Sequence, residues 1–187
     1  MCIRDRCVNV SKSIDRLEEE TAELIHQKEL QDARAEAEQK LEKLLLQQTE
    51  KLGEIQDDIN LRMETINGVV TEKQETAPLL YITPQKDIIF ETPGNTSEGT
   101  AFKSLVVYDL SVLELRPIPA IIHDSNILKR IEDVHLEHIL ERYQSTKRQV
   151  FIAFDKADST TEKAHRILEE TAILRLSDGN ELFGRSW

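Results

Sequence analysis

The 187-residue chain combines 32% charged residues with 5% aromatic residues, a composition that indicates a long solvated helix beside a smaller globular domain. Its formal net charge of −11 argues against non-specific binding of nucleic-acid phosphates by this chain alone. The two cysteines, Cys2 and Cys7, argue against a zinc ribbon or a disulfide framework and predict a reducing, cytoplasmic location. No apolar run reaches the roughly 18 residues that a membrane span needs.

Residues 1–10 look like a non-native leader, and we predict that residues 11–76 form a coiled-coil arm. The arm contains no proline and is rich in Glu, Lys, Gln, Leu and Ala, which favours helix throughout. Apolar residues recur in a seven-residue repeat that weakens in its middle, at Leu17, Leu24, Leu45, Leu52, Ile59 and Ile66. Because we expect no other part of the chain to cover this stripe, the arm needs a partner helix. A generic dimeric coiled coil is the alternative.

We predict an α/β lobe at residues 77–187, after Ala77-Pro78 ends the long helix. The helices expected in this lobe span residues 101–115, 127–145 and 159–170. The expected strands span residues 79–82, 87–91, 120–122, 149–154, 172–176 and 181–183. Strands alternate with helices from residue 117 onward, which predicts parallel βαβ units with an antiparallel hairpin ahead of them.

The loop at residues 94–100, rich in Gly, Asn, Thr and Ser, leads directly into the most apolar helix. A polar, glycine-bearing loop at a helix N-terminus is a common way to bind phosphate. Ser97 and Thr100 offer hydroxyl groups, and Gly99 permits a close approach to the backbone. The alternative is an ordinary Ser cap with Glu98 in the first helical turn.

Three further residues carry chemistry that a site needs. Asp124 directly follows an apolar strand, and a strand-end acid close to a phosphate-sized loop is a common way to bind a nucleotide. Its alternative role is to cap the turn that follows. His135 and His138 share a helix face with a spacing that suits a metal, but without a cysteine or a second histidine pair nearby we expect them at the surface and core edge.

The order of these parts resembles the C-terminal half of an SMC/RecF-type ABC ATPase head, and most of all its uncharacterised YydD-like branch. The resemblance covers roughly residues 40–187. The matching motifs in this chain are Glu98-Gly99-Thr100, Ile122-His123-Asp124 and Leu182-Phe183-Gly184. The resemblance implies an α/β fold in which a long N-terminal coiled-coil helix precedes the C-terminal lobe of a P-loop (ABC-type) ATPase head.

The resemblance implies that the glycine loop is the ABC signature loop. In such heads this loop faces ATP held by a second head. The implied contacts to the terminal phosphate come from Asn95, Ser97, Gly99 and Thr100.

The resemblance also implies that Asp124 is the Walker B acid, which holds Mg²⁺ through water. The family pattern has Glu next, and this chain has Ser125. The resemblance implies a switch histidine after the strand at residues 149–155, and in this chain Asp155 or Lys156 stands in its place. Ser125 and Asp155 are therefore further catalytic candidates, and Asn126, His123 and Asp133 remain open as residues that position the attacking water.

The chain has no G-x-x-x-x-G-K-[ST] loop, which in the resembled family lies in the N-terminal half. We therefore expect a C-terminal fragment that completes an ATP and Mg²⁺ site only with its missing half, and that is inactive alone. The resemblance implies as partners that missing half with its antiparallel helix, a second head in a homodimer, and DNA for the full protein, in DNA maintenance or defence.

The alternative from another class is a non-enzymatic coiled-coil scaffold with a small α/β interaction domain. In that reading Ser97, Gly99, Thr100 and Asp124 are structural. A toprim- or receiver-like acid pocket would need a second acid beside the 120–124 strand, and the D-x-D pattern is absent.

Overall fold

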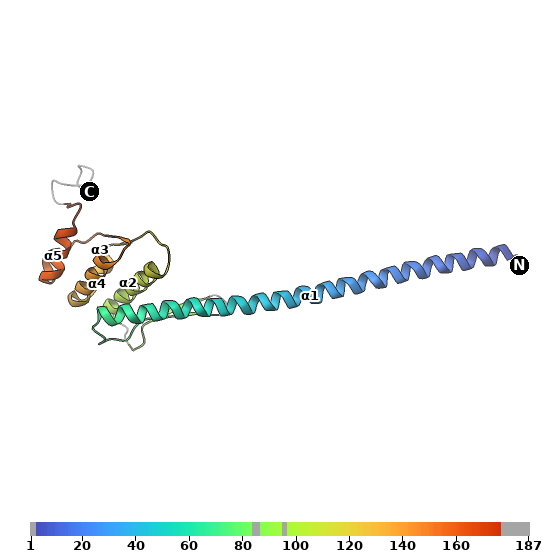
Figure 1. Ribbon diagram of the computed structural model, residues 1–187, viewed down its shortest axis with the longest axis horizontal. Helices are drawn as coiled ribbons and strands as arrows, with labels where there is room; N and C mark the ends of the chain where they lie inside the picture. The colour runs from blue at the N-terminus through green and yellow to red at the C-terminus, as the bar shows by residue number, and fades with distance from the viewer. Residues whose placement is uncertain (1–2, 84–86, 95–96, 177–187) are drawn as a thin grey trace. The chain divides into compact units, whose positions relative to one another are not determined.

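The computed structural model describes residues 3–83, 87–94 and 97–176, which form a mixed α/β fold with a long N-terminal helix and two small sheets (Figure 1). The chain divides into two compact units, residues 1–51 and 52–187. In the described ranges, no helix is both long enough and apolar enough to cross a membrane.

Helix α1 spans Ile3–Val70, so it includes most of the segment set aside as a leader and ends before residue 76. The prediction that Pro78 ends the helix is wrong. Glu72 and Lys73 adopt left-handed backbone conformations, with φ of 52° and 63°. The Lys73 N–H donates to the Gly68 carbonyl at 3.0 Å and the Glu72 N–H donates to the Val69 carbonyl at 3.4 Å, the pair of bonds that closes a Schellman motif.

The apolar stripe of α1 has two different environments. In the first unit its leucine and isoleucine side chains are exposed in the single chain, as at Ile14, Leu17, Leu24 and Leu45. In the second unit the continuing stripe is buried in the core, at Ile59, Met63, Ile66 and Val70. The expectation that the chain covers none of this stripe is therefore wrong for the last turns of α1, because the α/β lobe packs on them.

Strands β1 (Leu79–Ile82) and β2 (Ile88–Glu91) form the expected antiparallel hairpin, with Leu80 opposite Phe90. The Asn60 side chain of α1 fixes the hairpin by donating to the Leu80 carbonyl at 2.9 Å and accepting from the Leu80 N–H at 2.8 Å. The hairpin is thus held to the buried part of α1 through the backbone N–H and carbonyl of Leu80.

The rest of the lobe alternates helices and strands. Its elements are α2 (Glu98–Leu115), β3 (Ala120–His123), α3 (Ser125–Leu128), α4 (Asp133–Ser145), β4 (Gln149–Ile152), the 3-10 helix η1 (Ala157–Ser159) and α5 (Glu162–Thr171). Strands β3 and β4 pair in parallel, with His123 opposite Ile152, which confirms the parallel unit.

Two expected elements of the lobe are wrong. The helix expected at 127–145 is two helices, because Ile131 turns into the core between them and is buried. Residues 172–176 form no strand: α5 ends at Thr171, and Ile173 is almost fully exposed rather than paired. The strand expected at 181–183 and the Leu182-Phe183-Gly184 motif lie outside the described residues.

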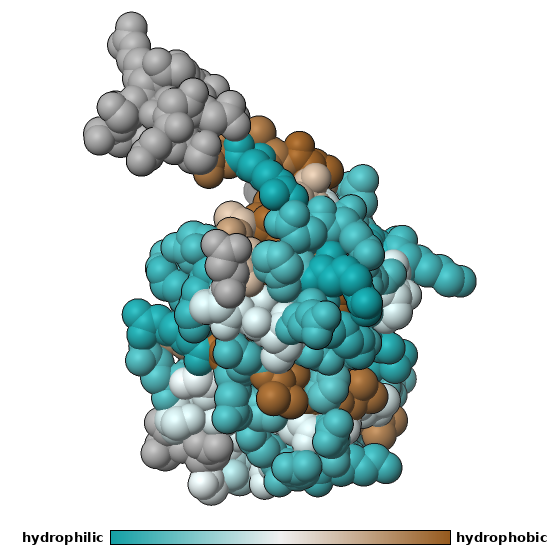
Figure 2. All heavy atoms as spheres, turned by 90° about the vertical axis from the view of Figure 1, so that its left-hand side faces the viewer, coloured by the Kyte–Doolittle hydropathy of each residue, from teal (hydrophilic) through white to brown (hydrophobic). Residues whose placement is uncertain are grey.

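The core of the lobe joins α1, α2 and α4. Its fully buried apolar residues include Met63, Val106, Leu110, Leu136 and Ile139. The face drawn in Figure 2 is largely hydrophilic, with isolated hydrophobic patches. One face of the parallel sheet stays open, since Ile122 is 77% exposed and Phe151 is 45% exposed.

Candidate functional site

Helix α2 begins with a side-chain cap at the position expected for a phosphate-facing loop. Ser97 is the N-cap in an extended conformation, and its Oγ accepts from the Thr100 N–H at 3.2 Å. The same hydroxyl donates to Thr100 Oγ1 at 2.8 Å, and Glu98 occupies the first turn. The capping role that the sequence left open is therefore present. Asn95 lies outside the described residues.

A hollow of about 300 Å³ opens beside this helix start, and Ser97, Gly99 and Thr100 all line it. Two cationic side chains, Lys103 and Arg130, line the same hollow. Because side chains in a helix tilt toward its N-terminus, Lys103 reaches back along the face that carries Thr100. The sequence predicted the three loop residues but missed both cations.

The cations of the hollow are each held by a carboxylate. The Lys103 ammonium pairs with Glu75 Oε2, and the Lys103 side chain is 2% exposed. The Arg130 guanidinium pairs with Glu98 and lies 5.5 Å from the centroid of the Phe102 ring. The Glu98 carboxylate in the first turn of α2 is thus paired with Arg130.

Gly99 is needed for packing at this point. A Cβ at Gly99 would lie 2.8 Å from the Arg130 carbonyl oxygen, closer than real Cβ atoms come. The glycine therefore lets the first turn of α2 rest against the loop between α3 and α4.

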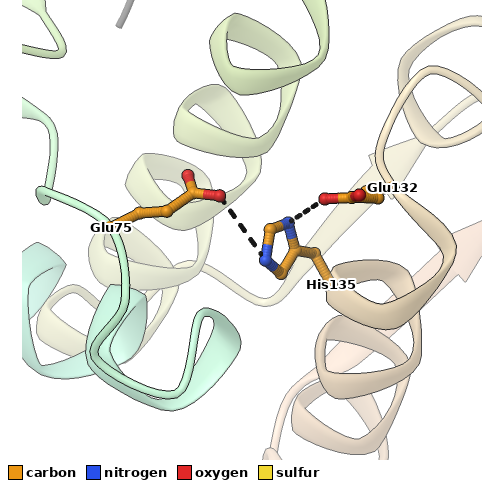
Figure 3. A group of neighbouring side chains, drawn as sticks. All are labelled: Glu75, Glu132 and His135. Carbon is orange, nitrogen blue, oxygen red and sulfur yellow. Dashed lines mark ion pairs between the residues drawn. The ribbon is translucent and has the colours of Figure 1, made fainter. Parts of the chain in front are cut away.

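Glu75, Glu132 and His135 meet at the edge of the hollow, as Figure 3 shows. His135 Nε2 lies 3.6 Å from Glu75 Oε1, and Nδ1 lies 3.6 Å from Glu132 Oε2. One ligand atom from each of the three falls within 4.8 Å of the others, a set that offers nitrogen and oxygen ligands to a divalent cation. The Lys103 ammonium opposes a cation here, because it already neutralises Glu75.

The histidine pair that the sequence noted does not form a shared site. The ring Nδ1–H of His138 donates to the Val70 carbonyl at 2.9 Å, and its Nε2 lies 3.9 Å from Glu72. His135 instead faces the two glutamates. Glu75 lies in the connection after α1. The spacing of histidines within α4 therefore could not predict that His135 faces Glu75.

The strand-end candidates form a second group. Asp124 is exposed and caps α3, accepting from the Asn126 N–H at 2.6 Å. Because β3 and β4 are parallel neighbours, their carboxyl ends meet, and the Ser125 hydroxyl donates to Asp155 Oδ1. The Asp155 N–H donates back to Ser125 Oγ at 3.3 Å. The fold thus brings Ser125 and Asp155 together beside Asp124.

Asp155 is held in its charged form. The hydrogen bond from Ser125, with a smaller contribution from the Lys129 ammonium 3.6 Å away, lowers the pKa of Asp155 below its usual value. A carboxylate with a lowered pKa is a poor general base at neutral pH, so Asp155 suits charge stabilisation better than proton transfer.

His123, at the end of β3, is buried and engaged on both sides. Its Nδ1 lies 2.6 Å from the Tyr143 hydroxyl and its Nε2 lies 3.0 Å from Asp109 Oδ2. Burial, followed by the Asp109 carboxylate, raises the pKa of Tyr143, so the phenol donates to Nδ1 and Nε2–H donates to Asp109. His123 therefore anchors the strand rather than positioning a water molecule.

The candidate residues thus fall into two clusters. Among the residues that the structure describes, Asp124, Ser125 and Asp155 do not line the hollow that Ser97, Gly99 and Thr100 line. Arg130 connects the clusters along the chain, since it follows α3 closely and faces the hollow.

Comparisons with known proteins give a family match and a weak structural likeness. The model of a family described as "Uncharacterised protein conserved in bacteria (DUF2326)" matches residues 55–187. One similar solved chain comes from work on the "Structural biochemistry of ATP-driven dimerization and DNA stimulated activation of SMC ATPases". It is 12% identical, the match covers 63% of this chain and 75% of that chain, and the TM-score of 0.45 is too low to support an argument. No curated protein sequence matches.

Proposed function

We propose that this chain, which belongs to the DUF2326 family of uncharacterised bacterial proteins, supplies one half of a composite ATP site in an SMC-like ATPase. In this proposal the hollow at the start of α2 receives the terminal phosphate of ATP that a second head holds. Asp124 holds Mg²⁺ through water. The observation that carries the proposal is that Ser97, Gly99 and Thr100 line one hollow together with two cationic side chains.

The chemistry of the hollow suits a phosphate group. The start of α2, an 18-residue helix, presents backbone N–H groups and the positive end of the helix dipole. The Ser97 and Thr100 hydroxyls add further polar contacts. Arg130 adds a planar guanidinium, the group best matched to phosphate oxygens.

The chemistry of the strand ends suits a hydrated magnesium ion. The exposed Asp124 carboxylate uses one oxygen for the Asn126 N–H and keeps further lone pairs for water molecules bound to the ion. The Asp155 carboxylate adds a second negative charge nearby, since its pKa is lowered by the Ser125 hydrogen bond. Ser125 replaces the expected glutamate, so in this proposal it orients water instead of taking its proton.

The open parallel sheet supports the need for a second half. Parallel sheets are normally covered on both faces, and two strands alone are marginally stable. Here Ile122 and Phe151 leave an apolar face of β3 and β4 exposed. In the proposal, the P-loop half of the head covers that face, its antiparallel helix covers the exposed stripe of α1, and two such heads form a homodimer. DNA maintenance or defence is the proposed context.

A non-enzymatic coiled-coil scaffold is the second candidate. The observation that favours it is the exposed stripe of the first unit, which includes Leu17, Leu24 and Leu45. A parallel or antiparallel coiled coil would cover this stripe without any nucleotide. The scaffold predicts that changes at Ser97 and Asp124 affect neither ATP turnover nor assembly.

ATP turnover tests the proposal, measured on this chain and on the complete product of its gene. We expect none from the chain alone, because it contains no P-loop. In the complete product, Ser97→Arg and Asp124→Asn should each reduce turnover at least about tenfold. The matched controls are Ser145→Arg and Asp87→Asn, which make the same changes at exposed positions outside both clusters.

Two results would overturn the proposal. The first is turnover by the chain alone that Asp124→Asn abolishes. The second is wild-type turnover by both site variants of the complete product.

A further inference from the structure

We infer that Glu75 holds the place of a phosphate group in the hollow, neutralising Lys103 until a phosphate enters and takes over that ammonium. The inference rests on the proposed function, because it assigns a resident competitor to the same phosphate site. It goes beyond it by naming Lys103 as the buried anchor and Glu75 as the group that is displaced.

The burial of Lys103 is the first step. Its side chain is 2% exposed and lines the hollow, and the ammonium pairs with Glu75 Oε2. A buried charge without a partner is strongly unfavourable. Any state in which Glu75 leaves must therefore give Lys103 another anion. Phosphate oxygens at the start of α2 meet that need.

The difference in exposure decides which partner moves. The Glu75 side chain is 30% exposed, fifteen times the 2% of Lys103, so its carboxylate has a route to solvent that the ammonium lacks. Its second oxygen lies 3.6 Å from His135 Nε2, too far for a hydrogen bond (Figure 3). Glu75 is thus tied by one strong contact, and Lys103 is enclosed.

The main chain at Glu75 stays in place during the exchange. Asn67, in the last turn of α1, donates from Nδ2 to the Glu75 carbonyl at 2.9 Å, and Asn67 is buried. The exchange is therefore a rotation of the Glu75 side chain.

The charge balance sets the ligand class. An incoming anion must replace one full carboxylate charge and also approach Glu132, which lines the same hollow. A dianionic phosphate carries more charge to Lys103 and Arg130 than a monovalent carboxylate does, and more oxygens to accept hydrogen bonds. We therefore expect phosphate and pyrophosphate to bind, and acetate not to compete at the same concentration.

Titration of this chain with inorganic phosphate, followed by amide NMR shifts, tests the exchange. In Glu75→Gln the competitor is neutral, and we expect the dissociation constant to fall about tenfold from the wild-type value. Glu72→Gln is the matched control, because it removes the same charge three residues earlier without facing the hollow. We expect it to stay within about twofold. In the wild type, phosphate should shift Lys103, Thr100 and Glu75 signals together.

Equal affinities in Glu75→Gln and Glu72→Gln would overturn the inference, because the effect would then be net charge alone. Glu75→Asp guards against misfolding of the glutamine variant: it retracts the carboxylate by one methylene, and an affinity no tighter than wild type would also contradict us. A third contrary result is Mn²⁺ binding at Glu132 and His135 with no phosphate binding.

The outcome is separable from that of the proposed function. Tighter phosphate binding in Glu75→Gln, with turnover of the complete product indifferent to Ser97→Arg, would keep the exchange and refute the ATP role. Turnover lost in Ser97→Arg, with no change of phosphate affinity in Glu75→Gln, would refute the exchange alone.

Discussion

Replacement of Gly99 by alanine tests whether this glycine serves packing. The new Cβ would stand 2.8 Å from the Arg130 carbonyl oxygen, a backbone atom that cannot swing aside as the end of a side chain does. Either the first turn of α2 or the loop that carries Arg130 must shift. Ser97 and Thr100 sit in that same turn, so the shift also disturbs the cap.

The expected magnitude follows from two opposing effects. Forcing an extra methyl group into a packed contact costs about 1–3 kcal/mol. Alanine recovers up to about 1 kcal/mol of helix propensity, and less than that in a first turn. We therefore expect Gly99→Ala to lower the free energy of unfolding by about 1–2 kcal/mol.

Urea denaturation followed by circular dichroism measures this change, with Gly53→Ala as the matched control. Gly53 lies inside α1, and among the described atoms none stands within 4 Å of a Cβ placed there. Its replacement should raise stability by about 0.5–1 kcal/mol, the ordinary helix-interior gain. A Gly99→Ala variant as stable as the wild type, or stabilised like Gly53→Ala, would refute the packing role. Turnover of Gly99→Ala is informative only after its folded fraction is known.

Three further outcomes are expected. Met63→Ala should cost about 2–5 kcal/mol in urea denaturation because it empties a fully buried position, whereas Leu61→Ala, at a residue 66% exposed, should stay within about 0.5 kcal/mol. Thr161→Ala should cost about 1 kcal/mol by removing the N-cap of α5, and Thr161→Ser should retain most of it. The Thr161 hydrogen bond lowers the pKa of the Glu137 carboxyl below its usual value. The stabilisation that it provides is therefore present above the pKa of an unfolded glutamate and lost as pH falls through the lowered pKa, and Glu137→Gln should flatten this acid limb of the stability curve.

The parts of the fold that depend on local signals were predictable. The hairpin is bounded by turn residues, and the apolar runs at β3 and β4 flank helices, so both strand pairs followed from the sequence. The end of α1 did not, because Glu72 and Lys73 take left-handed conformations that usually favour glycine or asparagine. The last turns of α1 pack in the core of the lobe, and local sequence signals do not report a tertiary contact of this kind.

The apolar composition of residues 172–176 gave a false strand. A strand needs a neighbour for its backbone groups, and composition alone does not supply one. The break between α3 and α4 was also missed. Asp124 is a good cap signal, but it marks only the start of the short helix α3 and not its end.

In the candidate site, too, the residues with local signals were predicted and the tertiary contacts were missed. Ser97, Gly99 and Thr100 were recognised because cap and loop chemistry is visible in consecutive residues. The ion pair of Lys103 with Glu75 was missed, because it joins residues 28 positions apart through the packing of α2 against the connection after α1.

The central claim is that ATP lies between two heads, and mixing two inactive variants tests it most directly. One variant of the complete gene product carries Ser97→Arg, and the other carries an alanine in place of the P-loop lysine that the proposal requires. Mixed dimers hold one intact site out of two, and half of the dimers are mixed, so turnover should return to about a quarter of wild type. A mixture as inactive as each variant alone would contradict the claim.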